Sequence, residues 1–130
     1  MEIETDWKPG DSMSGFSTMF QLNENMINFL READFGRIDP DDPTSTLVKD
    51  VYNLDHVQTS NTVELISLFS IYSRVNNLVD PVDHRVLHPD ALLKKHFGTI
   101  LREKGLTDTM RYADYCCIIA RCHSPIVAAN

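Results

Sequence analysis

The residues with the clearest potential for chemistry are histidines and aspartates gathered between positions 80 and 90. The set is Asp80, Asp83, His84, His88 and Asp90. Imidazole and carboxylate ligands together suit zinc, iron or manganese, so His84, His88 and Asp83 form the candidate metal site. The competing interpretation is structural, because His88 precedes a proline, which favours a loop, and aspartates stabilise helix ends. We favour the structural interpretation and predict no cofactor.

A second group that could do chemistry is the set of three cysteines, Cys116, Cys117 and Cys122. An odd, partly vicinal set is a poor disulfide framework, and free cysteine behaves as a small core hydrophobe. A Cys/His hydrolase would also need a base and an orienting group from elsewhere in the chain. We therefore expect free thiols in a reducing, intracellular and cytoplasmic setting, and no thiol catalysis.

Residues 37–45, here called the acidic loop, carry two prolines and three aspartates, a composition that excludes regular structure. The segment resembles a calcium loop only superficially, since Pro43 and Thr44 stand where that motif needs a ligand and a glycine. We interpret it as a partner-contact loop. The carboxylates expected to contact the partner are Asp39, Asp41, Asp42, Asp34 and Glu32.

The charge of the chain is strongly uneven. Its 130 residues carry a net charge of −7. Residues 1–55 hold twelve Asp or Glu and four Lys or Arg, a net of −8, whereas residues 56–130 hold seven and eight, a net of +1. An acidic balance argues against a nucleic-acid or anionic-membrane surface and favours a basic partner, whose approach the acidic half would steer.

A basic cluster late in the chain supports an alternative, a DNA-binding helical module. The cluster consists of Lys94, Lys95, Arg102, Lys104 and Arg111. Phosphate binding uses such clusters, but a recognition helix must follow the helical pair, and only residues 124–130 remain for it. We therefore rank direct nucleic-acid binding below protein binding.

The element that would position these groups is the stretch 61–79, whose polar residues rather than its apolar ones form a stripe. They are Glu64, Ser67, Ser70, Arg74 and Asn77, at steps of 3, 3, 4 and 3. That period predicts a helix that is apolar over most of its circumference and wrapped by other elements. Glu64 and Arg74 are the groups expected to line a cleft if the fold has one, and otherwise form a solvated edge.

Apolar periodicity and capping residues predict four further helices, at about 24–35, 46–55, 89–104 and 107–121. Asn23 is a suitable N-cap for the first, and Gly36 and Gly105 suit left-handed positions after helix ends. The sequence therefore predicts an all-α, single-domain bundle of about five helices around residues 61–79. Residues 1–22 are expected to be an extended N-terminal arm and lead-in, and residues 23–130 the helical domain.

These patterns favour a non-enzymatic protein-binding module. Many inhibitors, adaptors, immunity proteins and phage anti-defence factors are small, acidic proteins without catalytic motifs, and we compare this chain with them by general type alone. The expected partner is a larger protein with a basic patch, such as one that binds nucleic acid. The chain has no run of about 20 apolar residues, so we predict no membrane span. The apolar segment 126–129 leaves room for a homodimer.

Overall fold

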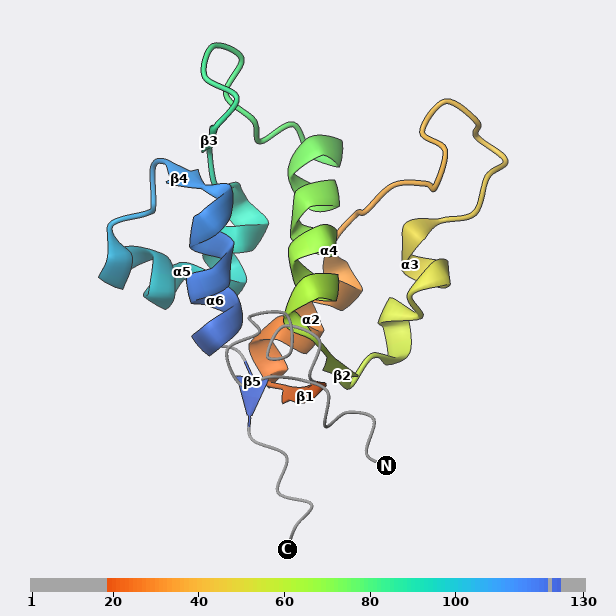
Figure 1. The fold of residues 1–130 in the computed structure, drawn as a ribbon, viewed down its shortest axis with the longest axis horizontal. Helices are drawn as coiled ribbons and strands as arrows, with labels where there is room; N and C mark the ends of the chain where they lie inside the picture. Colours follow the sequence, from red (N-terminus) through yellow and green to blue (C-terminus); the bar gives the residue numbers. More distant parts are fainter. Residues whose placement is uncertain (1–18, 122, 125–130) are drawn as a thin grey trace, which may run out of the picture.

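The computed structural model describes residues 19–121, 123 and 124, in which short strands alternate with helices (Figure 1). In chain order the elements are β1 (Phe20–Leu22), α2 (Glu24–Glu32), α3 (Val48–Val51), the 3-10 turn η2 (Leu54–His56), β2 (Thr59–Ser60), α4 (Thr62–Val75), β3 (Val86–Leu87), α5 (Ala91–Lys104), β4 (Met110–Arg111), the 3-10 turn η3 (Tyr112–Asp114), α6 (Tyr115–Arg121) and β5 (His123–Ser124). The predicted arm, residues 1–22, lies mostly outside these described residues, as does the apolar segment 126–129.

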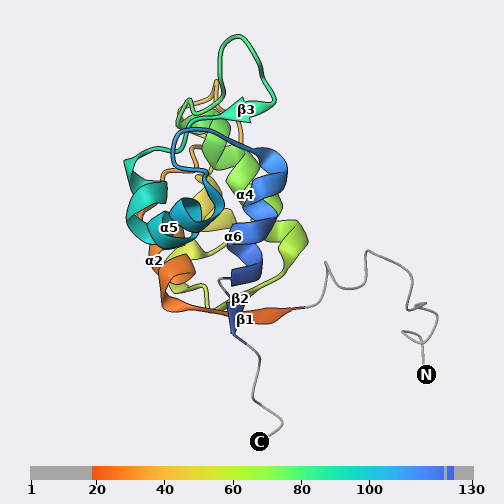
Figure 2. The same ribbon diagram turned by 90° about the vertical axis from the view of Figure 1, so that its left-hand side faces the viewer.

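The prediction of an all-α fold is wrong, because in the described part of the chain two small antiparallel sheets accompany five helices. One sheet has the strand order β2-β1-β5, with Phe20 opposite Ser60 and Gln21 opposite Ser124. The other pairs β3 with β4, with Val86 opposite Arg111. The sheets tie chain segments together at opposite ends of the helical body (Figure 2).

The helix expected around residues 61–79 forms as α4 but ends earlier, at Val75. Asn61 caps its start by accepting a hydrogen bond from the Glu64 N–H at 2.8 Å. Asn77 has a φ of 60°, a left-handed conformation that asparagine tolerates and that stops the helix. Leu78 is buried beyond that point, and the chain leaves as an extended segment toward β3.

Two other predicted helices form only in part. In place of a helix over 46–55, α3 makes a single turn. The left-handed Asn53, with a φ of 53°, then interrupts the helical conformation before η2. In place of a helix over 107–121, the chain first forms β4 and η3, and α6 begins only at Tyr115. Both predictions rest on apolar spacing, which a short strand next to a turn can imitate.

Helix ends that were predicted from capping residues agree better with the structure. Asn23 caps α2 by accepting from the Met26 N–H at 3.0 Å. Gly105, with a φ of 69°, ends α5. Gly36 also has a left-handed backbone, with a φ of 70°, but α2 has already ended at Glu32. This glycine therefore shapes the start of residues 36–51 and does not end a helix.

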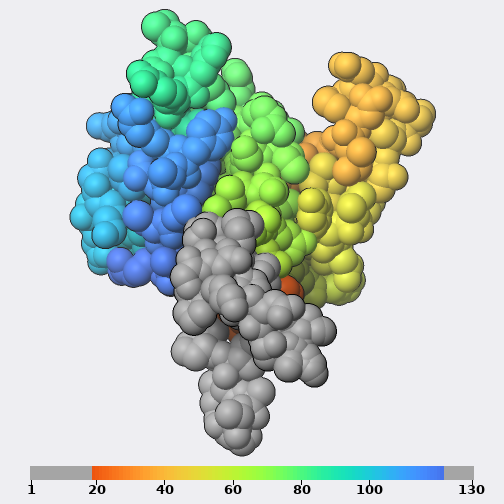
Figure 3. Space-filling model, viewed as in Figure 1, coloured from red at the N-terminus to blue at the C-terminus, as the bar shows by residue number. Residues whose placement is uncertain are grey.

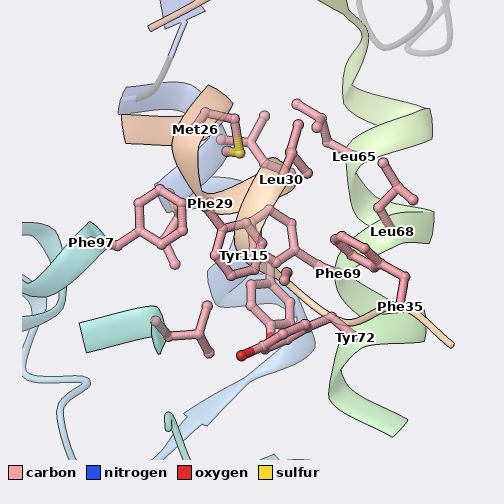
Figure 4. Packing of buried hydrophobic residues seen from close by; sticks show 14 of the residues in the cluster. Met26, Phe29, Leu30, Phe35, Leu65, Leu68, Phe69, Tyr72, Phe97 and Tyr115 are labelled. Atoms are coloured by element: carbon pink, nitrogen blue, oxygen red, sulfur yellow. The ribbon is translucent and has the colours of Figure 1, made fainter. Parts of the chain in front are cut away.

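A cluster of aromatic rings forms the centre of the core (Figure 4). Phe69 on α4 stacks on Phe29 of α2 at a centroid distance of 5.3 Å and on Tyr115 of α6 at 4.4 Å. Phe97 of α5 lies 5.2 Å from Phe29. Each ring is almost completely buried, and aromatic pairs add about 0.5–1.5 kcal/mol beyond the burial of their area. The rings therefore join all four main helices.

Two buried hydroxyl groups connect α4 to its neighbours. The Tyr72 hydroxyl donates to Asp90, whose other carboxylate oxygen accepts from the Leu93 N–H and caps α5. Ser73 donates to the Phe69 carbonyl at 2.8 Å, which leaves its oxygen to accept from the Tyr115 hydroxyl at 2.6 Å. Burial raises the pKa of Tyr115 to about 12, so this hydroxyl keeps its proton at neutral pH.

The longest helices of the described part of the chain are α4 and α5, each of 14 residues. Since a membrane-spanning helix needs about 20 apolar residues, none in this part could cross a membrane.

Truncating the shared ring tests this packing. We expect Phe29→Ala to lower the free energy of unfolding by about 3–5 kcal/mol, because it opens a cavity against Phe69, Tyr72 and Phe97. Asn28→Ala, at an exposed position of the same helix, is the control and should change it by no more than about 0.5 kcal/mol. Urea denaturation measures both, and a loss below about 1 kcal/mol for Phe29→Ala would contradict the packing described.

Candidate functional site

A segment held to one side of the body defines the most distinctive surface of the molecule. Residues 36–51, here called the lateral segment, comprise the acidic loop and α3. Figure 1 shows it on one side of α4, with α5 and α6 on the other side. The space-filling view in Figure 3 shows a notch between the upper part of this segment and α4.

The lateral segment begins at Gly36, which lies directly against α4. A Cβ atom at Gly36 would come within 3.0 Å of Val75 Cγ2, and the positive φ is itself unfavourable for other residues. Asn76, just after α4, donates its side-chain N–H to the Asp34 carbonyl at 2.9 Å. The Asp34 carboxylate accepts from the Gly36 N–H at 2.9 Å. This junction fixes where the segment leaves the core.

Backbone hydrogen bonds join the two ends of the acidic loop like the base of a hairpin. The Ile38 N–H donates to the Thr46 carbonyl at 2.8 Å, and the Val48 N–H donates to the Gly36 carbonyl at 2.9 Å. The Arg37 guanidinium donates to the Ser45 carbonyl at 2.6 Å. The loop is therefore an ordered projection whose shape its own polar groups determine.

The predicted partner-contact aspartates form the tip of this projection. Asp39 accepts from the Asp41 N–H at 3.0 Å, and Asp42 accepts from both the N–H and the hydroxyl of Thr44. The Thr44 hydroxyl and N–H bonds lower the pKa of Asp42, which keeps it charged. Only one oxygen of Asp39 and one of Asp42 is used in this way within the described residues. The structure thus brings Asp39, Asp41 and Asp42 together on one exposed turn.

The other two predicted contact residues lie elsewhere. Asp34 is at the junction described above. Glu32 faces α5, where its carboxylate forms an ion pair with Lys95 at 2.9 Å and lies 3.3 Å from His96 Nε2. The hydrogen bond from Lys95 lowers the pKa of Glu32. Glu32 therefore already has a cationic neighbour in Lys95 and is separated from the acidic loop.

Between the lateral segment and α4 lies an open cleft of about 660 Å³, here called the lateral cleft. A volume of this size falls in the range of small-molecule sites. Its lining residues are Gly36, Arg37, Ile38, Pro40, Val48, Ile71, Arg74 and Val75. Apart from the two arginines the lining is apolar. Ile38 and Val75 are 56% and 42% exposed, values that leave apolar surface uncovered in the cleft.

The two arginines make the cleft cationic, although one of its walls belongs to the acidic half of the chain, residues 1–55. Within the described residues, neither Arg37 nor Arg74 forms an ion pair with a carboxylate. Among the side chains that the structure describes, Arg74 reaches only the Ser70 hydroxyl, at 3.4 Å. Of the two residues expected at a cleft, Arg74 lines it, whereas Glu64 accepts from the Ser60 hydroxyl at 3.0 Å beside β2. Sequence reasoning missed the aliphatic lining, for which the lone Ile38 in a polar loop was the available signal.

Two of the three proposed metal ligands, His88 and Asp83, form bonds within the loop between α4 and α5. His88 Nε2 lies 2.8 Å from Asp80, and Asp83 forms an ion pair with Arg85 at 3.0 Å. Asp80 also accepts from the N–H groups of Val82 and Asp83. His84 is exposed. Across residues 19–121, 123 and 124, no three His, Cys, Asp or Glu side chains are grouped so that they could hold a metal ion.

The remaining candidate groups are dispersed. Cys116 is an exposed free thiol and Cys117 a half-buried one, while Cys122 lies outside the described residues. In the basic cluster, Lys95 is paired with Glu32. Arg111 lies on β4 and not on the helix expected for a DNA-binding pair.

Comparisons with protein-family models, with curated proteins and with solved structures find no match to this chain.

The pairing of Asp80 and His88 predicts a pH dependence. The Asp83 N–H, the His88 bond and the Val82 N–H lower the pKa of Asp80 to about 2, and the Asp80 bond raises the pKa of His88 above 6.5. The Asp80 contribution to stability is present above pH 3.8 and lost as pH falls toward 2. The His88 contribution is complete below pH 6.5 and lost as pH rises through its raised pKa.

We therefore expect the His88 ring to titrate with a pKa above 6.5 in an NMR experiment, and Asp80→Asn to lower its pKa toward that value. An unchanged pKa in the variant would contradict the pairing.

The junction at Gly36 gives a second prediction. Gly105 is the control, because it has nearly the same φ but no atom within 4 Å of the place that a Cβ would occupy. Gly36→Ala and Gly105→Ala should each lower the free energy of unfolding by about 1–2 kcal/mol, through the left-handed backbone alone. Only Gly36→Ala should also shift the methyl resonances of Val75. Unshifted Val75 methyl resonances in Gly36→Ala would show that the lateral segment does not pack against α4 as described.

Proposed function

We propose that this chain is a non-enzymatic protein-binding module that docks the acidic loop on a basic patch of a larger protein. The observation that carries the proposal is the grouping of Asp39, Asp41 and Asp42 on a projecting turn whose backbone is internally hydrogen-bonded. By analogy of type, the chain is proposed to be an inhibitor, adaptor, immunity protein or phage anti-defence factor.

The order of the loop supports this proposal on energetic grounds. Binding costs free energy when side chains and loops must be ordered at the interface. Here the Ser45 hydroxyl lies 2.9 Å from the carbonyls of both Asp39 and Asp42, which share its one proton, and these contacts fix the turn before any partner arrives. A loop with preset carboxylate positions therefore loses less affinity to ordering than a loop that folds on contact.

The electrostatics support a basic partner. Residues 1–55 carry a net charge of −8, and the acidic loop is the part of the described residues where three of those carboxylates are adjacent and exposed or half-buried. Complementary charge accelerates association and disfavours acidic partners. A protein whose basic patch binds nucleic acid fits the proposal well, because carboxylates on a turn can occupy the places of phosphates.

The use of other reactive side chains is consistent with a binding role. Asp80 is bonded to His88, Asp83 to Arg85, and Asp90 to Tyr72. These pairs close a loop or cap a helix, so in each case a structural task accounts for the groups. The docking proposal needs none of them to react.

Charge removal from the loop tests the proposal. In Asp39→Asn, Asp41→Asn and Asp42→Asn combined, the amide oxygens can still accept the turn hydrogen bonds, so charge is lost while the loop is kept. We expect association with a partner captured from the native cell to slow by about tenfold or more at low salt, with wild-type binding weakening steeply as salt rises.

The matched control is the triple variant Glu24→Gln, Glu103→Gln and Asp108→Asn, which removes the same charge from exposed positions outside the lateral segment. Surface plasmon resonance at two salt concentrations compares the three proteins. Equal association rates for both triple variants, or binding that does not depend on salt, would sink the proposal.

A further inference from the structure

We infer that the lateral cleft is a second recognition site, which receives an aliphatic side chain together with a neighbouring carboxylate from a segment of the partner protein. The inference rests on the proposed function in one respect, since the segment is assigned to the partner that the acidic loop docks on. The site itself depends only on the cleft, and its chemistry is opposite in sign to that of the loop.

The aliphatic part of the assignment comes from the walls of the cleft. Ile71 and Val75 on α4 and Ile38 of the lateral segment supply the accessible aliphatic lining, while Val48, which is 3% exposed, adds little open surface. These aliphatic side chains offer apolar area and dispersion contacts. They provide no aromatic ring for stacking and no hydrogen-bond acceptor for a polar group. Burying an aliphatic side chain between them removes apolar surface from water on both partners, which favours binding.

The carboxylate part comes from the arginines. Arg74 is exposed and has a single long contact among the described residues, to Ser70 at 3.4 Å. Arg37 uses one donor on the Ser45 carbonyl and retains others. Guanidinium groups bind carboxylates with two parallel hydrogen bonds, and such pairs are stronger than neutral ones. A carboxylate next to the aliphatic side chain would thus meet available donors at the side of an apolar cleft.

The open shape and the acidic rim indicate a protein segment. A cleft open to solvent admits a chain that enters and leaves, and the acidic loop beside it would repel a second carboxylate. The complementary segment therefore carries its carboxylate into the cleft and its Lys or Arg residues toward Asp39, Asp41 and Asp42. This alternation sets the direction in which the segment lies.

The test uses the full chain labelled at isoleucine and valine methyl groups, observed by NMR. The probe is the peptide acetyl-Ser-Leu-Leu-Glu-Ser-amide, and its neutral match has glutamine in place of glutamate. We expect saturable shifts at the methyls of Ile38, Val48, Ile71 and Val75, with those of Ile118 unchanged. The glutamate peptide should bind about fivefold more tightly than the glutamine peptide, as expected for one partly exposed ion pair.

Arg74→Gln should abolish the preference for the glutamate peptide. Arg102→Gln is the matched control, since Arg102 is also an exposed helical arginine with one long contact, to Thr99 at 3.4 Å. It should leave the roughly fivefold preference intact. Equal affinities of the two peptides for the parent chain, or shifts confined to other methyls, would overturn the inference.

Other occupants give distinct results. Hexanoate binding as tightly as the glutamate peptide would mean a small-molecule site and would overturn the assignment to a protein segment. Shifts of the same methyls with rising protein concentration and no peptide would mean a second copy of the chain, and would overturn it too.

Failure of this inference can be told apart from failure of the proposed function. The acidic-loop triple variant should bind the glutamate peptide at least as tightly as the parent, because it removes repulsion at the rim. If that variant still captures the partner normally, the docking proposal fails while the cleft can stand. If Arg74→Gln has no effect on either peptide, the cleft inference fails while docking by the loop can stand.

Discussion

The stacking of Phe69 between Phe29 and Tyr115 is the interaction on which the rest of the structure depends. It joins α2, α4 and α6 in one buried column, and Phe97 attaches α5 to the same column. Because these helices bury their apolar faces against one another, residues 36–51 contribute little to the core. The lateral segment contributes Val48 to the buried set and otherwise lies outside it. That separation is what leaves room for a cleft beside α4.

The proposed function depends on the lateral segment lying outside the core and being held by its own contacts. The left-handed Gly36 and the hydrogen bond from Asn76 to Asp34 set the position of the lateral segment, and the hairpin-like bonds of the loop set its shape. In the proposed complex, the negative charge at the tip and the positive charge in the cleft would both face the partner. An opposed pair of charges fixes orientation as well as affinity, because a reversed partner would meet repulsion at both places.

Sequence reasoning succeeded where structure is decided locally. The caps at Asn23 and Gly105 and the core of α4 follow from side-chain hydrogen bonding and helical periodicity within a few residues. It failed at the strands, which are two or three residues long and exist because distant segments such as β1 and β5 meet. The acidic loop could be identified from composition, but the cleft could not, since it depends on how Gly36 places Ile38 opposite α4.

The most direct test of the central claim, that the lateral segment and the adjoining face of α4 form the binding surface, is amide hydrogen exchange of the chain with and without its captured partner. The account predicts slower exchange in the complex over residues 36–51 and around Arg74, with α5 and α6 unchanged. Protection centred on the loop at residues 80–88, or on α5 and α6, would contradict it.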